Sequence, residues 1–259
     1  MPNLLAFDPT QYLGFAVIFA RISGMMISAP LFGEGTIPVQ VRVGLAFILS
    51  LVFVPVIATP NLPRNPAGPE IVLIMLAEVA VGVLIGATAR LLMAGITMAG
   101  EIAGFQMGLA VANVFDPTSN TQVSLIGQFK SNLALLLLVA MDGHHIFIRA
   151  LVTSYRAVPA GGLGLSDGMF YHFTAMAGNL FLVGLQIGAP LIVSLLAANF
   201  AIGLIGRSVP QINIIVVGFP FTIAMGLIIM ALGIPYFIEA VTALLGQLEK
   251  LMLNNLGNG

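Results

Sequence analysis

Long stretches without a charged residue constrain this chain more than any other feature. No charge occurs in the 39 residues between Asp167 and Arg207, or in the 31 residues between Arg207 and Glu239. A membrane-spanning helix needs about 20 mostly apolar residues, so each stretch exceeds what one span requires. The chain lacks the alternation of apolar and polar residues that a transmembrane barrel needs. The sequence therefore predicts an all-α integral membrane protein.

The composition supports this class and excludes several others. Hydrophobic residues make up 59% of the chain and charged residues 7%, whereas a soluble domain averages about 25% charged residues. A net charge of -1 is too small for a nucleic-acid surface, so no nucleic-acid partner is expected. The chain has no cysteine and therefore no thiolate metal site. Because it also lacks a nucleotide-binding loop and a catalytic constellation, we expect neither an enzyme nor a cofactor.

Prolines and glycines divide the chain into roughly seven to nine helical pieces, some of them broken. A loop is expected over residues 59–70, which contain four prolines, and another over Pro159–Gly168. Pro190 is expected to bend or divide the helix that contains it. The predicted helices span residues 12–29, 41–54, 71–98 (able to continue to 109), 123–141, 144–158, 169–205, 212–232 and 235–253.

Glycines that are four residues apart form three series in the apolar segments. On a helix this spacing places the glycines on one face, where another backbone can approach closely. We expect tight helix packing at these faces, with a partner helix either in this chain or in another subunit. The glycines are Gly82, Gly86, Gly100, Gly104, Gly108, Gly184 and Gly188.

Six charges fall inside or beside apolar segments, and three of them, Glu78, Glu101 and Lys130, are candidates for buried or pore-lining charges. The other three are Arg21, Arg90 and Arg149. Charges are costly in hydrocarbon and usually mark pairing or function. Glu78 cannot pair with Arg90 along one helix, because the two are twelve residues apart. These charges either pair between helices or line a polar path, and the sequence leaves both readings open.

Asp142, His144 and His145 carry the side-chain types that bind metals. They sit between two predicted helices and do not form the HExxH metal-binding pattern. A polar cluster at a helix end explains them better, so we predict no metal site.

The segment between residues 100 and 128 combines a glycine-faced helix with a helix break at Asp116–Pro117. Irregular backbone at membrane depth is tolerated only inside protein or beside a water-filled cavity. From physical chemistry alone, a pore-closing loop and a plain turn outside the membrane are equally good readings.

Four motifs follow one another over nearly the whole chain: RISGMMISAPLFGEGTIPVQVRVGLAFILSLV (21–52), GFQMGLAVANVFDP (104–117), DGHHIFIRALVTSYRAVPAGG (142–162) and RSVPQINIIVVGFPFTIAMGL (207–227). In this order they resemble the FliR family of flagellar biosynthetic proteins. The resemblance implies a core subunit of the flagellar type III export gate, which conducts unfolded flagellar proteins across the bacterial inner membrane at the flagellar basal body.

The resemblance also implies an assembly. One copy of this chain would join five FliP and four FliQ subunits in a helical complex within membrane lipid, near FlhB. Residues 1–165 would form a FliP-like part that includes the pore loop, and residues 166–259 a FliQ-like part. The loop near residues 106–122 would plug the closed pore. Its expected plug residues are Met107, Val111, Val114, Phe115, Asp116 and Pro117.

Two alternatives remain. The first is the equivalent subunit of a virulence injectisome. The second is a transporter for an ion or solute that works alone, with Glu78, Glu101 and Lys130 along its path.

Overall fold

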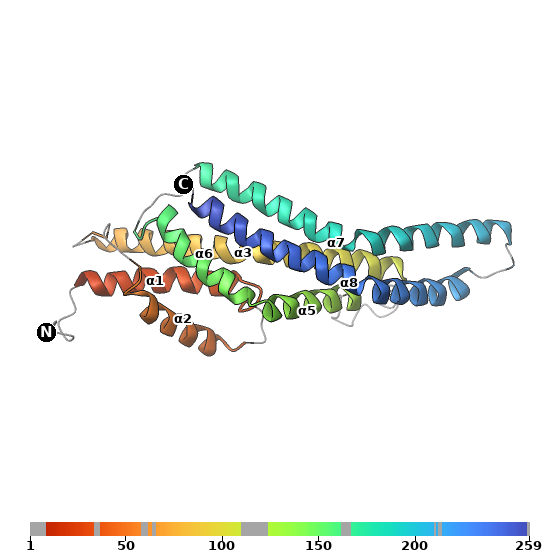
Figure 1. The fold of residues 1–259 in the computed structure, drawn as a ribbon, viewed down its shortest axis with the longest axis horizontal. Helices are drawn as coiled ribbons and strands as arrows, with labels where there is room; N and C mark the ends of the chain where they lie inside the picture. Colours follow the sequence, from red (N-terminus) through yellow and green to blue (C-terminus); the bar gives the residue numbers. More distant parts are fainter. Residues whose placement is uncertain are drawn as a thin grey trace. The chain divides into compact units, whose positions relative to one another are not determined.

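The computed structural model of the chain describes residues 9–33, 37–57, 62–63, 66–109, 124–161, 167–209, 211 and 214–257. These residues form seven α-helices and contain no strand, which confirms the predicted all-α class (Figure 1). In chain order the helices are α1 (Pro9–Ser28), α2 (Val39–Phe53), α3 (Gly68–Gln106), α5 (Leu125–Ala140), α6 (Gly143–Ala157), α7 (Asp167–Ser208) and α8 (Ile214–Gly257).

Three stretches of helix are long and apolar enough to cross a membrane. They are Gly68–Gln106, Ala177–Ser208 and Val216–Gly246. Helices α5 and α6 add a fourth span if the two are counted as one broken span. Length and composition thus agree with the prediction of a membrane protein built from helices.

Two predicted helix boundaries were wrong. The predicted loop over residues 59–70 ends earlier, because α3 already begins at Gly68, and Glu70 in its first turn accepts a hydrogen bond of 3.3 Å from the Ala67 N–H. The predicted break before Pro235 is absent, because α8 continues through that residue, as α7 does through Pro190. A proline removes a single backbone donor, and both prolines are exposed. The flanking apolar residues still favour a helix, because a helix satisfies the remaining backbone groups internally.

Contacts between residues divide the chain into two compact units. The first contains Met1–Arg90, Asp142–Ala177 and Gly246–Gly259, and the second contains Leu91–Met141 and Gly178–Leu245. Helices α3, α7 and α8 each contribute to both units. This division follows contacts, so the sequential division into parts 1–165 and 166–259 stays a prediction.

In the first unit, α1 packs against α2 and against the first half of α3. The rings of Phe15 and Phe47 meet edge to face with centroids 5.3 Å apart. A methyl group at Gly82 would overlap the backbone carbonyl of Arg21. At Gly86 it would lie 2.6 Å from the backbone nitrogen of Ala29. The glycine face of α3 thus lets the backbone of α1 come into direct contact.

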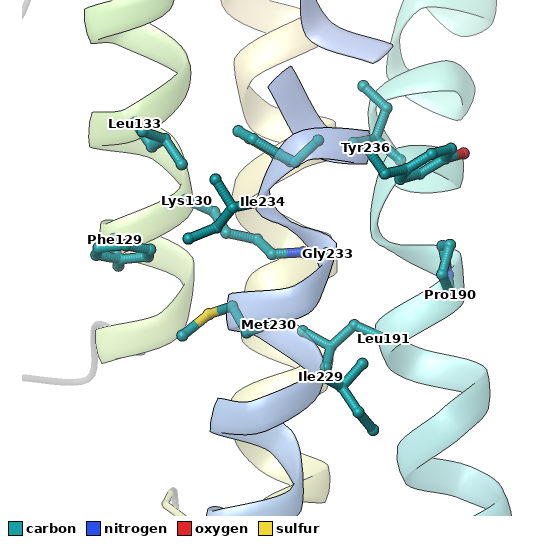
Figure 2. A pocket seen from close by; sticks show the side chains of 12 residues that line it. Phe129, Lys130, Leu133, Pro190, Leu191, Ile229, Met230, Gly233, Ile234 and Tyr236 are labelled. Carbon is teal, nitrogen blue, oxygen red and sulfur yellow. The ribbon is translucent and has the colours of Figure 1, made fainter. Parts of the chain in front are cut away.

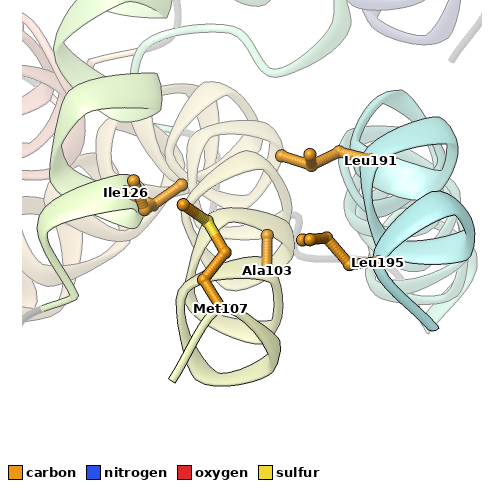
Figure 3. Packing of buried hydrophobic residues seen from close by; sticks show 5 residues of the cluster. All are labelled: Ala103, Met107, Ile126, Leu191 and Leu195. Atoms are coloured by element: carbon orange, nitrogen blue, oxygen red, sulfur yellow. The ribbon is translucent and has the colours of Figure 1, made fainter. Parts of the chain in front are cut away.

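In the second unit, the later half of α3 packs against α5 and α7. A Cβ atom at Gly100 would lie 2.6 Å from Gly127 Cα on α5, and one at Gly184 would lie 2.6 Å from the Leu92 carbonyl. Side chains from the three helices meet in a core (Figure 3). Its buried members are Ala103, Met107, Ile126, Leu191 and Leu195.

Candidate functional site

A buried ion pair lies at the centre of the first unit. The Arg21 Nε atom on α1 donates to the Glu78 Oε2 atom on α3 at 2.6 Å. The two side chains are 0% and 2% exposed. Removing two charges from water is costly, and their attraction offsets this cost only if the remaining donors and acceptors are also satisfied.

The neighbouring groups supply these additional contacts. Arg21 Nη1 donates to Ser154 Oγ at 3.0 Å, and Arg21 Nη2 donates to the Val158 carbonyl at 2.9 Å. The Glu78 Oε1 atom accepts a hydrogen bond of 3.0 Å from the Gly161 N–H. The guanidinium carbon of Arg21 lies 3.7 Å from the centroid of the Tyr155 ring, which is cation–π geometry. One ion pair therefore joins α1, α3, α6 and the segment that follows α6.

The sequence left two interpretations of Glu78 open, pairing between helices or a polar path. The structure shows pairing between helices, because Glu78 forms an ion pair with Arg21. The partners Ser154, Tyr155 and Gly161 were missed by sequence reasoning. No sequence spacing identifies them, because they approach Arg21 only through the packing of α6 on α1 and α3.

Side chains from α7 and α8 hold the end of α3 in the second unit. The last carbonyls of a helix lack donors within the helix and need other partners. The Asn199 side-chain amide donates to the Gln106 carbonyl at 3.0 Å. Thr222 Oγ1 donates to the Met107 carbonyl at 3.1 Å. The backbone that leaves α3 is therefore fixed by two polar contacts.

Close packing also holds the end of α3 in place, in addition to the hydrogen bonds from Asn199 and Thr222. Gly108 has a φ of 82°, which is in the left-handed region, and a Cβ atom there would overlap the Phe219 ring. Gly226 on α8 faces Met107, because a Cβ atom on this glycine would lie 2.7 Å from the Met107 sulfur. Met107 is 0% exposed. Among the expected plug residues, Met107 thus lies in the core of the second unit, at the point where the predicted pore loop begins.

The other expected plug residues have no structural description. Val111, Val114, Phe115, Asp116 and Pro117 lie outside the described residues. Their predicted role in closing a pore stays a prediction.

Lys130 lies in a small apolar pocket of the second unit (Figure 2). The pocket has a volume of about 60 Å³ and lies between α5, α7 and α8. Lys130 is 6% exposed, and its Nζ atom lies 5.6 Å from the centroid of the Phe237 ring. Figure 2 shows the Lys130 side chain extending from α5 towards Gly233 of α8. The other lining residues are Phe129, Leu133, Ile187, Pro190, Leu191, Ile229, Met230, Ile234 and Tyr236.

The three charges proposed for a polar path have different surroundings. Glu78 is buried and paired in the first unit, whereas Lys130 is buried in the second unit. Glu101 is also in the second unit, on an exposed position of α3. No salt bridge joins Glu101 to Lys130 in the part of the chain that the structure describes.

Asp142, His144 and His145 gather at the start of α6, with candidate ligand atoms within 4.8 Å of one another. Asp142 has a φ of 56°, and its carbonyl accepts a hydrogen bond of 2.8 Å from the His145 N–H. A helix N-terminus carries a partial positive charge, which disfavours a bound cation. We therefore interpret this group as a polar helix start.

Apolar helices of spanning length, glycine-mediated contacts between helices and a buried ion pair define a helical membrane protein. A family model described as "Bacterial export proteins, family 1" matches residues 12–248. The chain belongs to this family of bacterial export proteins.

Three relatives are each called flagellar biosynthetic protein FliR. The protein of Bacillus subtilis (strain 168) is 34% identical over 219 residues, which are 83% of this chain and 84% of the relative. That of Escherichia coli (strain K12) is 32% identical over 235 residues, or 90% of this chain and 88% of the relative. That of Aquifex aeolicus (strain VF5) is 30% identical over 220 residues, or 84% and 83% of the two chains. The expected resemblance to the FliR family is confirmed, and with it the assignment to flagellar biosynthesis and protein export.

Proposed function

We propose that this chain is a non-enzymatic core subunit of the flagellar type III export gate in the bacterial inner membrane, at the flagellar basal body. The observation that carries the proposal is the family match over residues 12–248, together with relatives named for flagellar biosynthesis. In this role the chain helps to form the channel through which unfolded flagellar proteins pass.

The distribution of exposed apolar side chains supports an assembly with other subunits. Only 17% of the most apolar window of α8 is buried inside the chain, against 39% for α3. Helix α2 also exposes a row of large apolar side chains, among them Phe47 and Ile48. Exposed apolar surface of this extent marks contact with protein or lipid. FliP-like subunits, FliQ-like subunits, FlhB and membrane lipid are the proposed neighbours.

Closure of the pore is the finer part of the proposal. The loop near residues 106–122 plugs the closed channel, with Phe115 as its aromatic residue. The anchored end of α3 supports this role, because Asn199 and Thr222 fix the backbone at which the loop starts. A loop that closes a pore needs a fixed attachment point, because a loop attached to mobile backbone would not return to the same closed position.

Native mass spectrometry of the chain, expressed with the neighbouring genes of its operon, tests the assembly. We expect a mixed complex with one copy of this chain, five FliP-like subunits and four FliQ-like subunits. A stable monomer or homodimer would instead support the transporter that works alone.

A leak assay tests the plug. Deletion of residues 110–120 should let small ions cross membranes that contain the assembled gate. Replacement of the same residues by a glycine–serine stretch of equal length is the matched control for loop length, and it should also leak if the side chains make the seal. A tight membrane with normal assembly in both variants would contradict the plug.

Complementation distinguishes the flagellar role from the injectisome alternative. The chain should restore swimming to a bacterium that lacks its own FliR-type subunit. Failure to restore swimming, together with rescue of injectisome secretion, would favour the alternative.

A further inference from the structure

Lys130 is a buried cation that has no carboxylate partner within the described part of this chain. Its side chain is surrounded by apolar groups, with the Phe237 ring 5.6 Å from its Nζ atom. Among the described residues, Glu78 is paired with Arg21, and no salt bridge joins Lys130 to Glu101 or Glu239. A cation–π contact offsets only part of the cost of burying an ammonium group. None of the described residues therefore supplies the anion that this site calls for.

The pocket has room for a small anionic group. Its volume of about 60 Å³ is several times the roughly 10–15 Å³ that one water needs on the same kind of measure. This space accommodates a carboxylate but not a whole lipid headgroup. The rest of the lining is apolar, so an anion there would find Lys130 as its strong partner.

The outer rim of the pocket is uncovered. Tyr236 is 52% exposed and Phe129 is 46% exposed, and both line the pocket. Leu232, adjacent to Gly233 on α8, is 77% exposed. An apolar helix can therefore lie against this rim and direct one side chain inwards.

We propose that the Lys130 pocket receives one aspartate or glutamate side chain from an apolar helix of another subunit. The ion pair formed there sets the register between that helix and the pocket formed by α5, α7 and α8, because the carboxylate has a single place to bind. This inference rests on the proposed function, since it requires neighbouring subunits.

Cross-linking with a hydrophobic carbodiimide tests the pairing in the intact, co-purified complex. The reagent activates a carboxylate, and an amine in contact with it displaces the urea to form an amide. The chain has only two lysines, Lys130 and Lys250, so a cross-linked peptide is easily assigned. We expect an amide between Lys130 and an aspartate or glutamate in an apolar segment of a different subunit.

Two variants provide the controls. Lys130→Arg keeps the positive charge but has no primary amine, so the amide should disappear while the complex still assembles. Lys130→Met removes the charge at similar length, and the yield of the complex should fall at least tenfold. Native mass spectrometry measures this yield for each variant.

Several results would overturn the inference. One is an amide between Lys130 and Asp116, Glu101 or Glu239 of the same chain. Others are an intact wild-type complex without any Lys130 amide, a normal yield of complex for Lys130→Met, or a bound phospholipid that only this variant loses. If the wild-type chain forms no mixed complex at all, the proposed function itself fails, which is a distinct outcome.

Discussion

The guanidinium group of Arg21 lies 2.6 Å from the carboxylate of Glu78, although 57 residues separate them in the sequence. The contact depends on the close approach of α1 to α3. Gly82, one helical turn after Glu78, faces the Arg21 carbonyl and leaves no room for a side chain. Backbone packing and the ion pair therefore stabilise the same crossing of two helices.

Glu78→Gln should strongly destabilise the protein. The substitution leaves the Arg21 charge buried without its counter-ion, and breaking a buried pair from one side costs about 3–5 kcal/mol. Thermal unfolding of the purified complex in detergent measures the effect. Glu101→Gln is the matched control on the same helix, because Glu101 is exposed and should tolerate the change. The double variant Arg21→Met, Glu78→Leu should recover part of the loss, and a double variant that is no better than Glu78→Gln would argue against the ion pair.

Gly82→Ala should disrupt the contact between α1 and α3. The added methyl group overlaps the Arg21 carbonyl, and overpacking of this kind costs about 1–3 kcal/mol or more. Gly203→Ala is the control, because no atom of the described residues lies within 4 Å of a Cβ added at Gly203. A glycine within a helix costs about 0.5–1 kcal/mol relative to alanine, so this control should be neutral or slightly stabilising. Unfolding midpoints that fall equally for the two variants would contradict the assigned packing.

Tyr155→Phe should leave the protein at least as stable as the wild type. The phenylalanine ring keeps the face against Arg21, whereas the buried Tyr155 hydroxyl has no hydrogen-bond partner in the described structure. An unsatisfied buried polar group costs about 1–3 kcal/mol, so its removal is favourable. Tyr155→Leu removes the ring and should lower the unfolding temperature. A drop for Tyr155→Phe equal to that for Tyr155→Leu would show that the hydroxyl is needed.

Asn199→Leu combined with Thr222→Val should loosen the end of α3. Each substitution removes one hydrogen bond to a terminal carbonyl, worth about 0.5–1.5 kcal/mol. If the following loop closes the pore, the double variant should assemble normally and leak ions in the same assay as the loop deletion. Ser194→Ala is a suitable control, because among the described residues Ser194 Oγ donates within α7, to the Pro190 carbonyl. If membranes with the double variant do not leak ions, the two hydrogen bonds at the end of α3 are not needed for pore closure.

The apolar sequence predicts the helices well, because about 20 consecutive apolar residues have few other stable structures in a membrane. It also predicts the α5–α6 boundary at Asp142–Gly143, where the chain turns with Asp142 in a left-handed conformation. It was less successful at prolines. Pro235 predicts a break, yet α8 continues through it, since the loss of one donor does not end a helix whose flanking residues remain apolar and hydrogen-bonded within the helix.

For the site, the sequence determined which residue types were out of place in apolar surroundings. It marked Glu78 and Lys130 as unusual, because a buried charge is costly wherever it occurs. It marked the glycines at four-residue spacing as points of close approach, because a residue without a side chain lets another backbone come near. Only the tertiary structure decided that Glu78 pairs with Arg21 while Lys130 faces an apolar pocket. The reason is that pairing depends on which helices cross and at what depth, and these are long-range relationships that local spacing does not encode.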